Sequence, residues 1–456
     1  MDDKKRNQVL SVLFLGVLMG ALDIAIVGPA MPAIRSSFGI SERLGSWIFG
    51  VYVLFNLIGT PVMAKLSDVF GRRSVYILDI SLFALGSVIT ALSASPHYWM
   101  LLLGRGIQGL GAGGIFPVAS AVIGDTFPPE KRGSALGIIG AVFGIAFLVG
   151  PLLGGLVLKL GGWNWLFLIN LPIAVLILIL AWRLLPNTHA QVSQAFDVGG
   201  MLILSVLLAL LAYGINQVDA TVLAESLIQN APFLLGALLL LPVLIFVEVR
   251  SSNPVLPPRL FNRRQLTLTY ILSAGAGIGE VSMVFIPEMV KKSLNISDNA
   301  TAGLMMMPVI LAMAVGSPLA GRLLDRWGSK RVIFSGASVM TLGMFLMAFF
   351  STQMQGFVAA SLLIGLGLSA LLGAPVRYIM LSESRMEERT IAQGVATLFT
   401  STGQLLSGAL VGAIAAVSSY ANAFFAIAFV GVLLVLLSIL LKGQAEEQAT
   451  SQQNAL

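Results

Sequence analysis

The chain has 456 residues, of which 57% are hydrophobic and 11% charged, whereas a soluble domain usually carries about 25% charged residues. This composition excludes an ordinary soluble globular protein and indicates a membrane protein. The net charge of +6 is not taken as a sign of nucleic-acid binding, because the basic residues concentrate in short loops. The chain contains no cysteine, which excludes disulfides and thiolate metal sites. We expect no metal and no cofactor.

Apolar segments long enough to cross a bilayer, about 20 residues each, recur along the whole chain. Fourteen transmembrane helices are predicted, at residues 9–33, 44–66, 75–94, 98–121, 134–158, 164–185, 197–215, 230–249, 266–290, 301–322, 331–350, 356–376, 391–417 and 420–441. The tail that follows them is polar, and we predict that it is disordered. The fold class is therefore an all-α polytopic membrane protein.

The orientation follows from the 27 Lys and Arg residues, most of which lie in loops on one side of the predicted spans. Short cytoplasmic loops carry such an excess of Lys and Arg. We predict that both termini are cytoplasmic and that the protein is a multi-pass protein of the cell membrane. The first helix is expected to be an uncleaved anchor, because its apolar run is too long for a signal peptide.

Two loops repeat a pattern of residues, AKLSDVFGRRSVY at 64–76 and GRLLDRWGSKRVI at 321–333. The repeat predicts two related six-helix bundles, 1–190 and 263–442, with an inserted helix pair at 191–262 and a cytoplasmic tail at 443–456. Transporters are commonly built from such parallel repeats, with substrate and ion sites near the midplane between the halves.

The residue types at the repeated positions of the two loops can be explained by their chemistry. Gly71 and Gly328 suit a tight turn with positive φ. Asp68 and Asp325 can pair with nearby arginines or cap a helix N-terminus, and Arg72 and Arg331 supply basic positions. The alternative is a short loop that only carries cytoplasmic positive charge.

Asp23 is the single charge in GALDIAIVGPAMP, residues 20–32. It lies about 21 Å into a helix that starts near Val9, so it must face protein or a water-filled cavity. Burial favours the protonated form of a carboxyl group, which would let proton and cationic substrate compete for Asp23. The alternative is an aspartate held by hydrogen bonds between helices for structural reasons alone.

Two further charged residues lie inside predicted spans. Glu280 corresponds to Asp23 in the second half to within one residue, which is about 100° of helix rotation, and it is a second candidate for binding a proton or a cation. Arg105 is costly within a span and is a functional candidate for that reason; the alternative is a structural arginine bonded to backbone carbonyls. Asp79, near the inside end of its helix, is expected to be structural or interfacial.

The motifs resemble those of the major facilitator superfamily over nearly the whole chain. The two repeated loops resemble its signature cytoplasmic loop, which gates the inside closure between the halves. LLLGRGIQGLGAGG resembles the fourth-helix motif, whose arginine, here Arg105, is implicated in proton transfer. GPLLGG, with Gly150, Pro151, Gly154 and Gly155, resembles the fifth-helix motif of antiporters. Ala146 departs from that motif, where glycine is usual.

Three features resemble the fourteen-helix drug:proton antiporter branch of this superfamily. They are the number of predicted spans, the first-helix motif LDIAIVGPAMP, and the segment WNWLFLINLP at 163–172. The resemblance implies a monomeric, proton-coupled multidrug exporter of amphipathic or cationic compounds that works by alternating access, with protons, small-molecule substrates and membrane lipids as partners. Two alternatives within transport stay open, an exporter of an endogenous lipid or metabolite and an uncoupled facilitator. A membrane-embedded enzyme is disfavoured because the chain lacks a recognisable set of catalytic groups.

Overall fold

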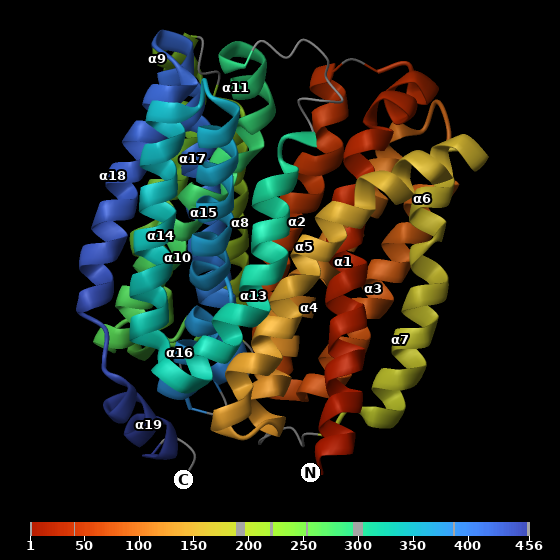
Figure 1. The fold of residues 1–456 in the computed structure, drawn as a ribbon. Helices are drawn as coiled ribbons and strands as arrows, with labels where there is room; N and C mark the ends of the chain where they lie inside the picture. Colours follow the sequence, from red (N-terminus) through yellow and green to blue (C-terminus); the bar gives the residue numbers. More distant parts are fainter. Residues whose placement is uncertain are drawn as a thin grey trace.

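The computed structural model describes residues 2–40, 42–187, 197–218, 222–251, 254–294, 304–385 and 388–453. Within these ranges all the regular structure is helical. The helices run mainly along one direction, and both ends of the chain lie at the same end of the bundle (Figure 1). We call this end the termini face and the other end the opposite face.

The helices form two bundles that lie side by side in Figure 1. The first half comprises α1 (Asp3–Phe38), α2 (Glu42–Phe70), α3 (Arg72–Leu92), α4 (Tyr98–Thr126), α5 (Pro129–Leu160), α6 (Asn164–Leu168) and α7 (Asn170–Leu184). The second half comprises α10 (Arg264–Ser282), α11 (Ile286–Ser293), α13 (Met307–Trp327), α14 (Ser329–Phe350), α15 (Met354–Leu371), α16 (Ala374–Glu383), α17 (Arg389–Val417) and α18 (Tyr420–Ile439). Each half has a large hydrophobic core of its own.

Two helices between the halves in sequence, α8 (Val198–Asn216) and α9 (Leu223–Arg250), pack against each other. Of the two, α8 also contacts α2 of the first half and α17 of the second. Leu57, Leu207 and Leu398 share the small apolar cluster that joins these three helices. The inserted pair therefore lies against the seam between α2 and α17.

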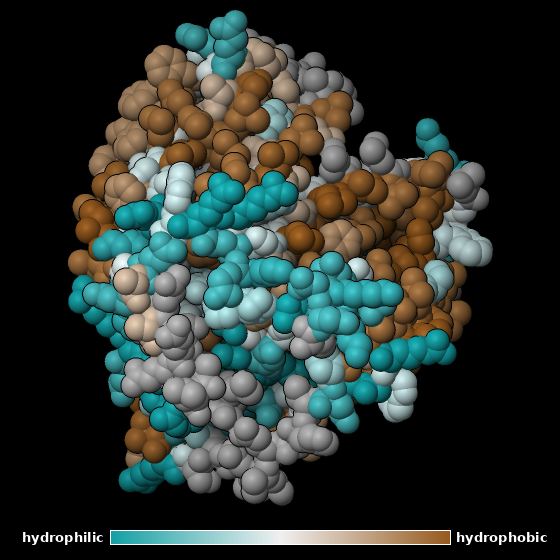
Figure 2. Space-filling model, turned by 60° about the horizontal axis from the view of Figure 1, so that its bottom comes forward, coloured by the Kyte–Doolittle hydropathy of each residue, from teal (hydrophilic) through white to brown (hydrophobic). Residues whose placement is uncertain are grey.

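Twelve helices within the described residues are long and apolar enough to cross a membrane. They do not include α5 or the α10–α11 pair, in which a 3-10 turn at Met283–Phe285 interrupts the helix. The number of fourteen crossings therefore stays a prediction. Hydrophilic side chains gather on the termini face, and hydrophobic side chains cover the flanks (Figure 2), as expected for a bundle surrounded by lipid.

The halves meet most extensively along two helix pairs, α5 with α13 and α2 with α17. The first pair packs closely at Gly133 and Gly321, where a Cβ on Gly321 would collide with the Gly133 carbonyl oxygen. Small residues allow such close approach of helices in a membrane, because backbone atoms then contact each other directly.

The repeated loops turn as the sequence predicts. Gly71 has φ 91° and Gly328 has φ 78°, and each precedes the first residue of the next helix, α3 or α14. Residues other than glycine are disfavoured in this region of φ, since their Cβ would clash with the backbone. The prediction of positive φ at both glycines is confirmed.

The prediction of a disordered tail is wrong for residues 444–453, which form α19 (Gln444–Gln453) at the termini face (Figure 1). Glu447 is 1% exposed, and its carboxylate accepts hydrogen bonds from the Ser329 hydroxyl and, at 3.3 Å, from the Ser329 backbone nitrogen. Ser329 begins α14, so Glu447 caps the N-terminus of that helix. This tertiary contact orders a segment whose composition alone predicts disorder.

Candidate functional site

Asp23 and Arg105 form an ion pair in the interior of the first half. Asp23 on α1 is 2% exposed and Arg105 on α4 is 0% exposed, and Nη1 of Arg105 lies 2.6 Å from Oδ2 of Asp23. Arg105 also donates from Nε to the Ile48 carbonyl at 3.3 Å and from Nη1 to Gln108 Oε1 at 2.9 Å. Both charges are therefore balanced inside the bundle, as burial in a membrane requires.

Two amide side chains complete the hydrogen bonding of Asp23. Gln108 Nε2 and Asn170 Nδ2 donate to Asp23 Oδ1 at 3.1 and 3.0 Å, and both also donate to Ser87 Oγ, at 2.8 and 3.3 Å. These partners come from α3, α4 and α7. Together with Arg105, these amides give both carboxylate oxygens of Asp23 a hydrogen-bond partner.

Aromatic rings enclose the Arg105 guanidinium. Its central carbon lies 4.2 Å from the Tyr52 ring centroid and 5.7 Å from that of Phe167. A cation over an aromatic face is attracted by the ring quadrupole, more strongly where water is excluded. The rings thus help to hold the positive charge in place.

Sequence reasoning did not identify Asn170, Ser87 and Tyr52 as members of this network. Asn170 has a weak signal, since it is an isolated polar residue at the start of the apolar helix α7. Serine and tyrosine are common in membrane helices and give no comparable signal. Only the packing of α3, α4 and α7 around α1 shows that these side chains converge on Asp23.

Glu280 lies in the second half and has a different environment. Gln404 of α17 donates from Nε2 to Glu280 Oε2 at 2.8 Å. In the described part of the chain no hydrogen bond or ion pair connects Glu280 with Asp23, since the partners of Asp23 all belong to the first half. Each carboxylate is held within its own half in this conformation.

The repeat relates Asp23 to Gly279 rather than to Glu280. Asp23 faces α3 and α4, and a Cβ on Gly279 would point to Met340 of α14 and Leu368 of α15, the helices that correspond to α3 and α4 in the second half. Glu280, one residue further along, faces α17, which corresponds to α5. The second half therefore has no carboxylate at the position equivalent to Asp23.

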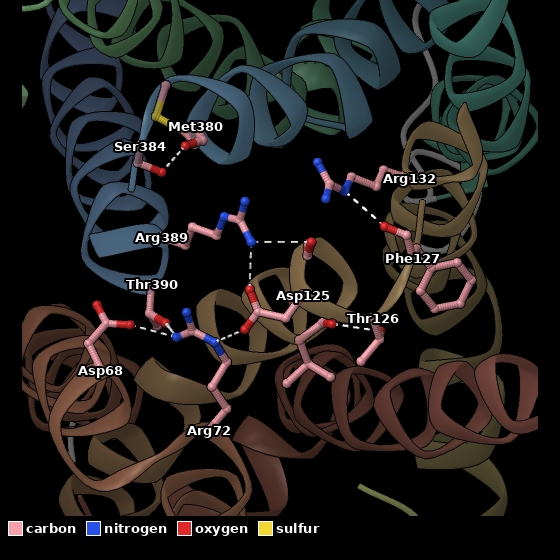
Figure 3. Close-up of polar contacts among 12 residues, drawn as sticks. Asp68, Arg72, Asp125, Thr126, Phe127, Arg132, Met380, Ser384, Arg389 and Thr390 are labelled. Atoms are coloured by element: carbon pink, nitrogen blue, oxygen red, sulfur yellow. Dashed lines mark hydrogen bonds and ion pairs between the residues drawn. The ribbon is translucent and has the colours of Figure 1, made fainter. Parts of the chain in front are cut away.

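A cluster of charged residues joins the halves at the termini face (Figure 3). Arg72 of α3 pairs with Asp68, with 2.5 Å between Nη1 and Oδ1, and with Asp125 of α4. Asp125 also pairs with Arg389 of α17, with 2.8 Å between Oδ1 and Nη1. Arg72 donates in addition to the hydroxyl of Thr390. We call this set the charge cluster.

The N-terminal turns of α17 and α5 are held by the two repeat aspartates. Asp68 Oδ2 accepts from the Ile391 nitrogen of α17 at 3.2 Å. Asp325 of α13 accepts from the Gly133 and Ser134 nitrogens of α5 at 3.0 and 3.1 Å, and from the Ser134 hydroxyl. The two halves are therefore closed against each other at the termini face.

Arg331, the other basic residue predicted in the gating loops, does not join these contacts. It is exposed and makes no hydrogen bond or ion pair with the described residues. The position equivalent to Arg72 in the second half is Ser329, directly after Gly328, and Glu447 of α19 binds it. The termini face is thus asymmetric. At the equivalent position the first half has Arg72, and the second half has Ser329, which binds Glu447.

The glycines of the fifth-helix motif have unequal surroundings. A Cβ on Gly150 would collide with Ala25 of α1, and one on Gly154 would lie 3.3 Å from the Ile26 carbonyl oxygen, whereas Gly155 has open space within 4 Å. Gly150 therefore allows α5 to lie close to α1, beside Asp23. The side chain of Pro151 is outside the described part of the structure.

Asp79 is fully buried between α3 and α4, and neither of its carboxylate oxygens has a hydrogen-bond partner among the described residues. Its oxygens lie against Gly114, where a Cβ would collide with them. Asp79 is therefore separate from the Asp23 network, although both are carboxylates within the first half.

A sequence model of the family described as Major Facilitator Superfamily matches residues 13–282 and 271–455 of the chain. The chain is 34% identical to the uncharacterized MFS-type transporter YfiU of Bacillus subtilis (strain 168), over 90% of this chain and 80% of that one. It is 30% identical to the multidrug transporter protein MdtP of the same organism, over 90% and 75% of the two chains.

Solved structures show the same fold. The human organic anion transporter TETRAN superposes with a TM-score of 0.70 at 17% identity, covering 96% of this chain and 100% of that one. The proton:xylose symporter XylE superposes with a TM-score of 0.67 at 18% identity, covering 96% and 95%. At these identities the comparisons show the fold alone.

Proposed function

Because this chain belongs to the major facilitator superfamily, and is thus a membrane-spanning transporter of small molecules rather than an enzyme, we propose that it is a proton-coupled exporter of amphipathic or cationic compounds. The proposal is supported by the multidrug transporter MdtP of Bacillus subtilis, which is 30% identical. Alternating access of the two halves is the proposed mechanism. The predicted fourteen crossings, the domain boundaries and the cytoplasmic termini belong to the same proposal.

The observation that carries the proposal is the buried pair of Asp23 and Arg105, 2.6 Å apart and almost inaccessible. An ion pair inside a membrane bundle is expensive, and an apolar pair of similar volume is often as stable or more stable. A functional demand explains why these charges are retained. In this role Asp23 binds the coupling proton.

Protonation of Asp23 removes one charge of the pair and leaves Arg105 uncompensated, which favours a rearrangement of α1 against α4. The movement passes to the interface because α1 packs closely on α5 at Ala25 and Gly150, and α5 packs on α13 of the other half. Inward proton movement supplies about 2.3 kcal/mol per charge per 100 mV of membrane potential. Glu280 is a second candidate for a proton or a cationic substrate.

With the termini in the cytoplasm, the conformation described here is closed on the inside. The charge cluster and Asp325 are the proposed inner gate, and their contacts break when the halves rock to the inward-open state. Asp68, Gly71, Arg72, Asp325 and Gly328 lie at this closure, whereas exposed Arg331 is the weakest candidate for a gating role. Two alternatives remain, an uncoupled facilitator and an exporter of an endogenous lipid or metabolite.

The test is ethidium accumulation in inverted membrane vesicles whose lumen is made acidic. The wild-type protein should accumulate ethidium, and an ionophore that collapses the proton gradient should abolish accumulation. Asp23→Asn should lose gradient-driven accumulation but keep exchange of ethidium down its own gradient, which shows that the variant is folded. Asp197→Asn is the matched control, because Asn can also cap α8 at that position.

Full gradient-driven accumulation by Asp23→Asn would remove Asp23 from the proposed role. Wild-type transport that ignores the ionophore would favour the uncoupled facilitator. Absence of ethidium transport, with transport of a fluorescent phospholipid instead, would favour the lipid exporter.

A further inference from the structure

Arg377 on α16 is a buried arginine that has no carboxylate partner. It is 7% exposed and forms no ion pair with any described residue. Arg72, Arg105 and Arg389, which are also buried in membrane helices, each pair with an aspartate. A cation buried in this way is costly unless it is compensated. Arg377 therefore lacks the counter-charge that these three other arginines have.

The hydrogen bonds of Arg377 leave one side of its guanidinium without a partner among the described residues. Nη1 makes all of them, to the Gln393 carbonyl at 3.1 Å, to Gln393 Oε1 at 3.3 Å and to Thr397 Oγ1 at 3.0 Å. Nε is buried without a partner, and Nη2 donates to no described residue. Nε and Nη2 form the side of the guanidinium that binds a carboxylate or phosphate with two parallel hydrogen bonds.

Arg377 also lies at the junction of the halves. The carbon of its guanidinium is 4.5 Å from the ring centroid of Phe116, which belongs to α4 of the first half. Phe116 in turn packs edge-to-face on Phe143 of α5, with 5.5 Å between the ring centroids. The Arg377 guanidinium and the rings of Phe116 and Phe143 thus lie together where the halves face each other.

The depth of Arg377 agrees with a site in the transport path. Its partner Gln393 lies four residues along α17 from Arg389 of the charge cluster, which is about 6 Å of helix rise. The guanidinium is therefore about one helical turn deeper in the bundle than the closure at the termini face. Separation of the halves there would uncover it.

We propose that Arg377 binds the oxyanion group of an amphipathic organic anion, while Phe116 packs against the apolar body of the same molecule. The inference rests on the proposed export function and adds to its substrate class the amphipathic compounds that carry a carboxylate or similar group, zwitterions included. Gln393 and Thr397 orient the guanidinium through Nη1, so that Nε and Nη2 point to the bound oxyanion.

The test uses two dyes with the same xanthene frame, fluorescein, an anion with a carboxylate, and rhodamine 123, a cation. Binding to purified full-length protein in detergent micelles is measured by fluorescence anisotropy, with empty micelles subtracted. The wild-type protein should bind fluorescein, and Arg377→Gln should weaken this binding at least about tenfold, the effect expected for loss of a charge-assisted pair. Binding of rhodamine 123 should not change.

Matched variants separate recognition from folding. Arg377→Lys keeps the positive charge but lacks the two parallel donors of a guanidinium. Its affinity for fluorescein should therefore lie between those of the wild type and Arg377→Gln. Arg183→Gln removes a charge from an exposed position in the last turn of α7 and should bind both dyes as the wild type does. If Arg377→Gln does not fold, Phe116→Leu serves in its place and should weaken fluorescein binding several-fold.

The inference is overturned if the wild type does not bind fluorescein, if Arg377→Gln binds it normally, or if the substitution weakens both dyes equally, as a structural role would. No proton gradient is present in this measurement. A wild-type protein without proton coupling in vesicles would therefore contradict the proposed function and leave the binding result unchanged. A protein that does not bind fluorescein would contradict this inference and leave the proton-coupling result unchanged.

Discussion

Asp68 and Asp325 occupy equivalent places in the two halves, and each accepts backbone hydrogen bonds from a helix of the opposite half. Asp68 binds the Ile391 nitrogen of α17 at 3.2 Å, and Asp325 binds the Gly133 nitrogen of α5 at 3.0 Å. The two contacts differ in charge. Asp68 also pairs with Arg72, whereas the partners of Asp325 are backbone amides and a hydroxyl.

We predict that Asp68→Asn opens the termini face more than Asp325→Asn does. Asp68→Asn removes one negative charge from the charge cluster, so that Arg72 and Arg389 share the one remaining aspartate, Asp125. Loss of one partner from a buried ion pair costs about 3–5 kcal/mol. Asp325→Asn weakens hydrogen bonds from neutral donors to a carboxylate, which costs about 1.5–3 kcal/mol. Because the chain has no cysteine, spin labels can be attached at introduced cysteines without removing others.

Labels at Ser74→Cys and Arg385→Cys report on the side of the charge cluster, and labels at Glu130→Cys and Arg326→Cys report on the α5–α13 side; all four positions are exposed. Double electron–electron resonance should show a longer distance between the labels at 74 and 385 in Asp68→Asn. The distance between the labels at 130 and 326 should change less in Asp325→Asn. Equal distance distributions in both variants and the wild type would show that these aspartates do not hold the closure.

We expect the Asp23–Arg105 ion pair to contribute to the stability of the folded protein as a coupled unit. Arg105→Gln leaves Asp23 charged and buried, so we expect a loss of about 3–5 kcal/mol in the free energy of unfolding. The double variant Asp23→Asn with Arg105→Gln has no buried charge at this place and should be more stable than Arg105→Gln alone. Thermal unfolding in detergent checks the order, and additive effects of the two substitutions would contradict the coupling.

Gly150 and Gly155 form a matched pair within one motif. Gly150→Ala places a methyl group against Ala25, whereas Gly155→Ala meets no atom within 4 Å. Overpacking of this kind costs about 1–3 kcal/mol, so Gly150→Ala should lower the unfolding temperature and slow ethidium transport. Gly155→Ala should change neither property. If both variants behave like the wild type, close packing of α5 on α1 is not required for transport.

Docking of α19 should depend on pH. Burial raises the pKa of Glu447 to about 7 from its usual value of 4.5. The docked state therefore holds a proton that the undocked state has already lost between pH 4.5 and 7, so docking weakens as the pH rises through this range and changes little above it. Glu447→Gln is neutral throughout and should dock independently of pH.

A single spin label at Ala449→Cys, an exposed position on α19, measures this equilibrium. Its electron paramagnetic resonance spectrum should show a growing mobile component from pH 5 to about pH 7 in the otherwise wild-type protein. The same label in Glu447→Gln should give one spectrum across the range. A mobile component that decreases with rising pH would contradict the assignment to Glu447.

Several features could be read from the sequence because they depend on local chemistry. Apolar runs of membrane length and an isolated charge within them need no knowledge of neighbours, and the positive φ of Gly71 and Gly328 follows from the turn that the repeated loops make. The tail is the opposite case. Its polarity predicts disorder, but one carboxylate, Glu447, binds the start of α14.

The sequence by itself determined the membrane class, the internal repeat, the turn glycines and the candidates Asp23 and Arg105. Only the tertiary structure decided that these two residues pair, that Asn170 joins them, and that Glu280 faces α17 while Gly279 takes the place of Asp23. The physical reason is rotation. One residue turns a side chain by about 100° around its helix, so partners are set by how the helices pack.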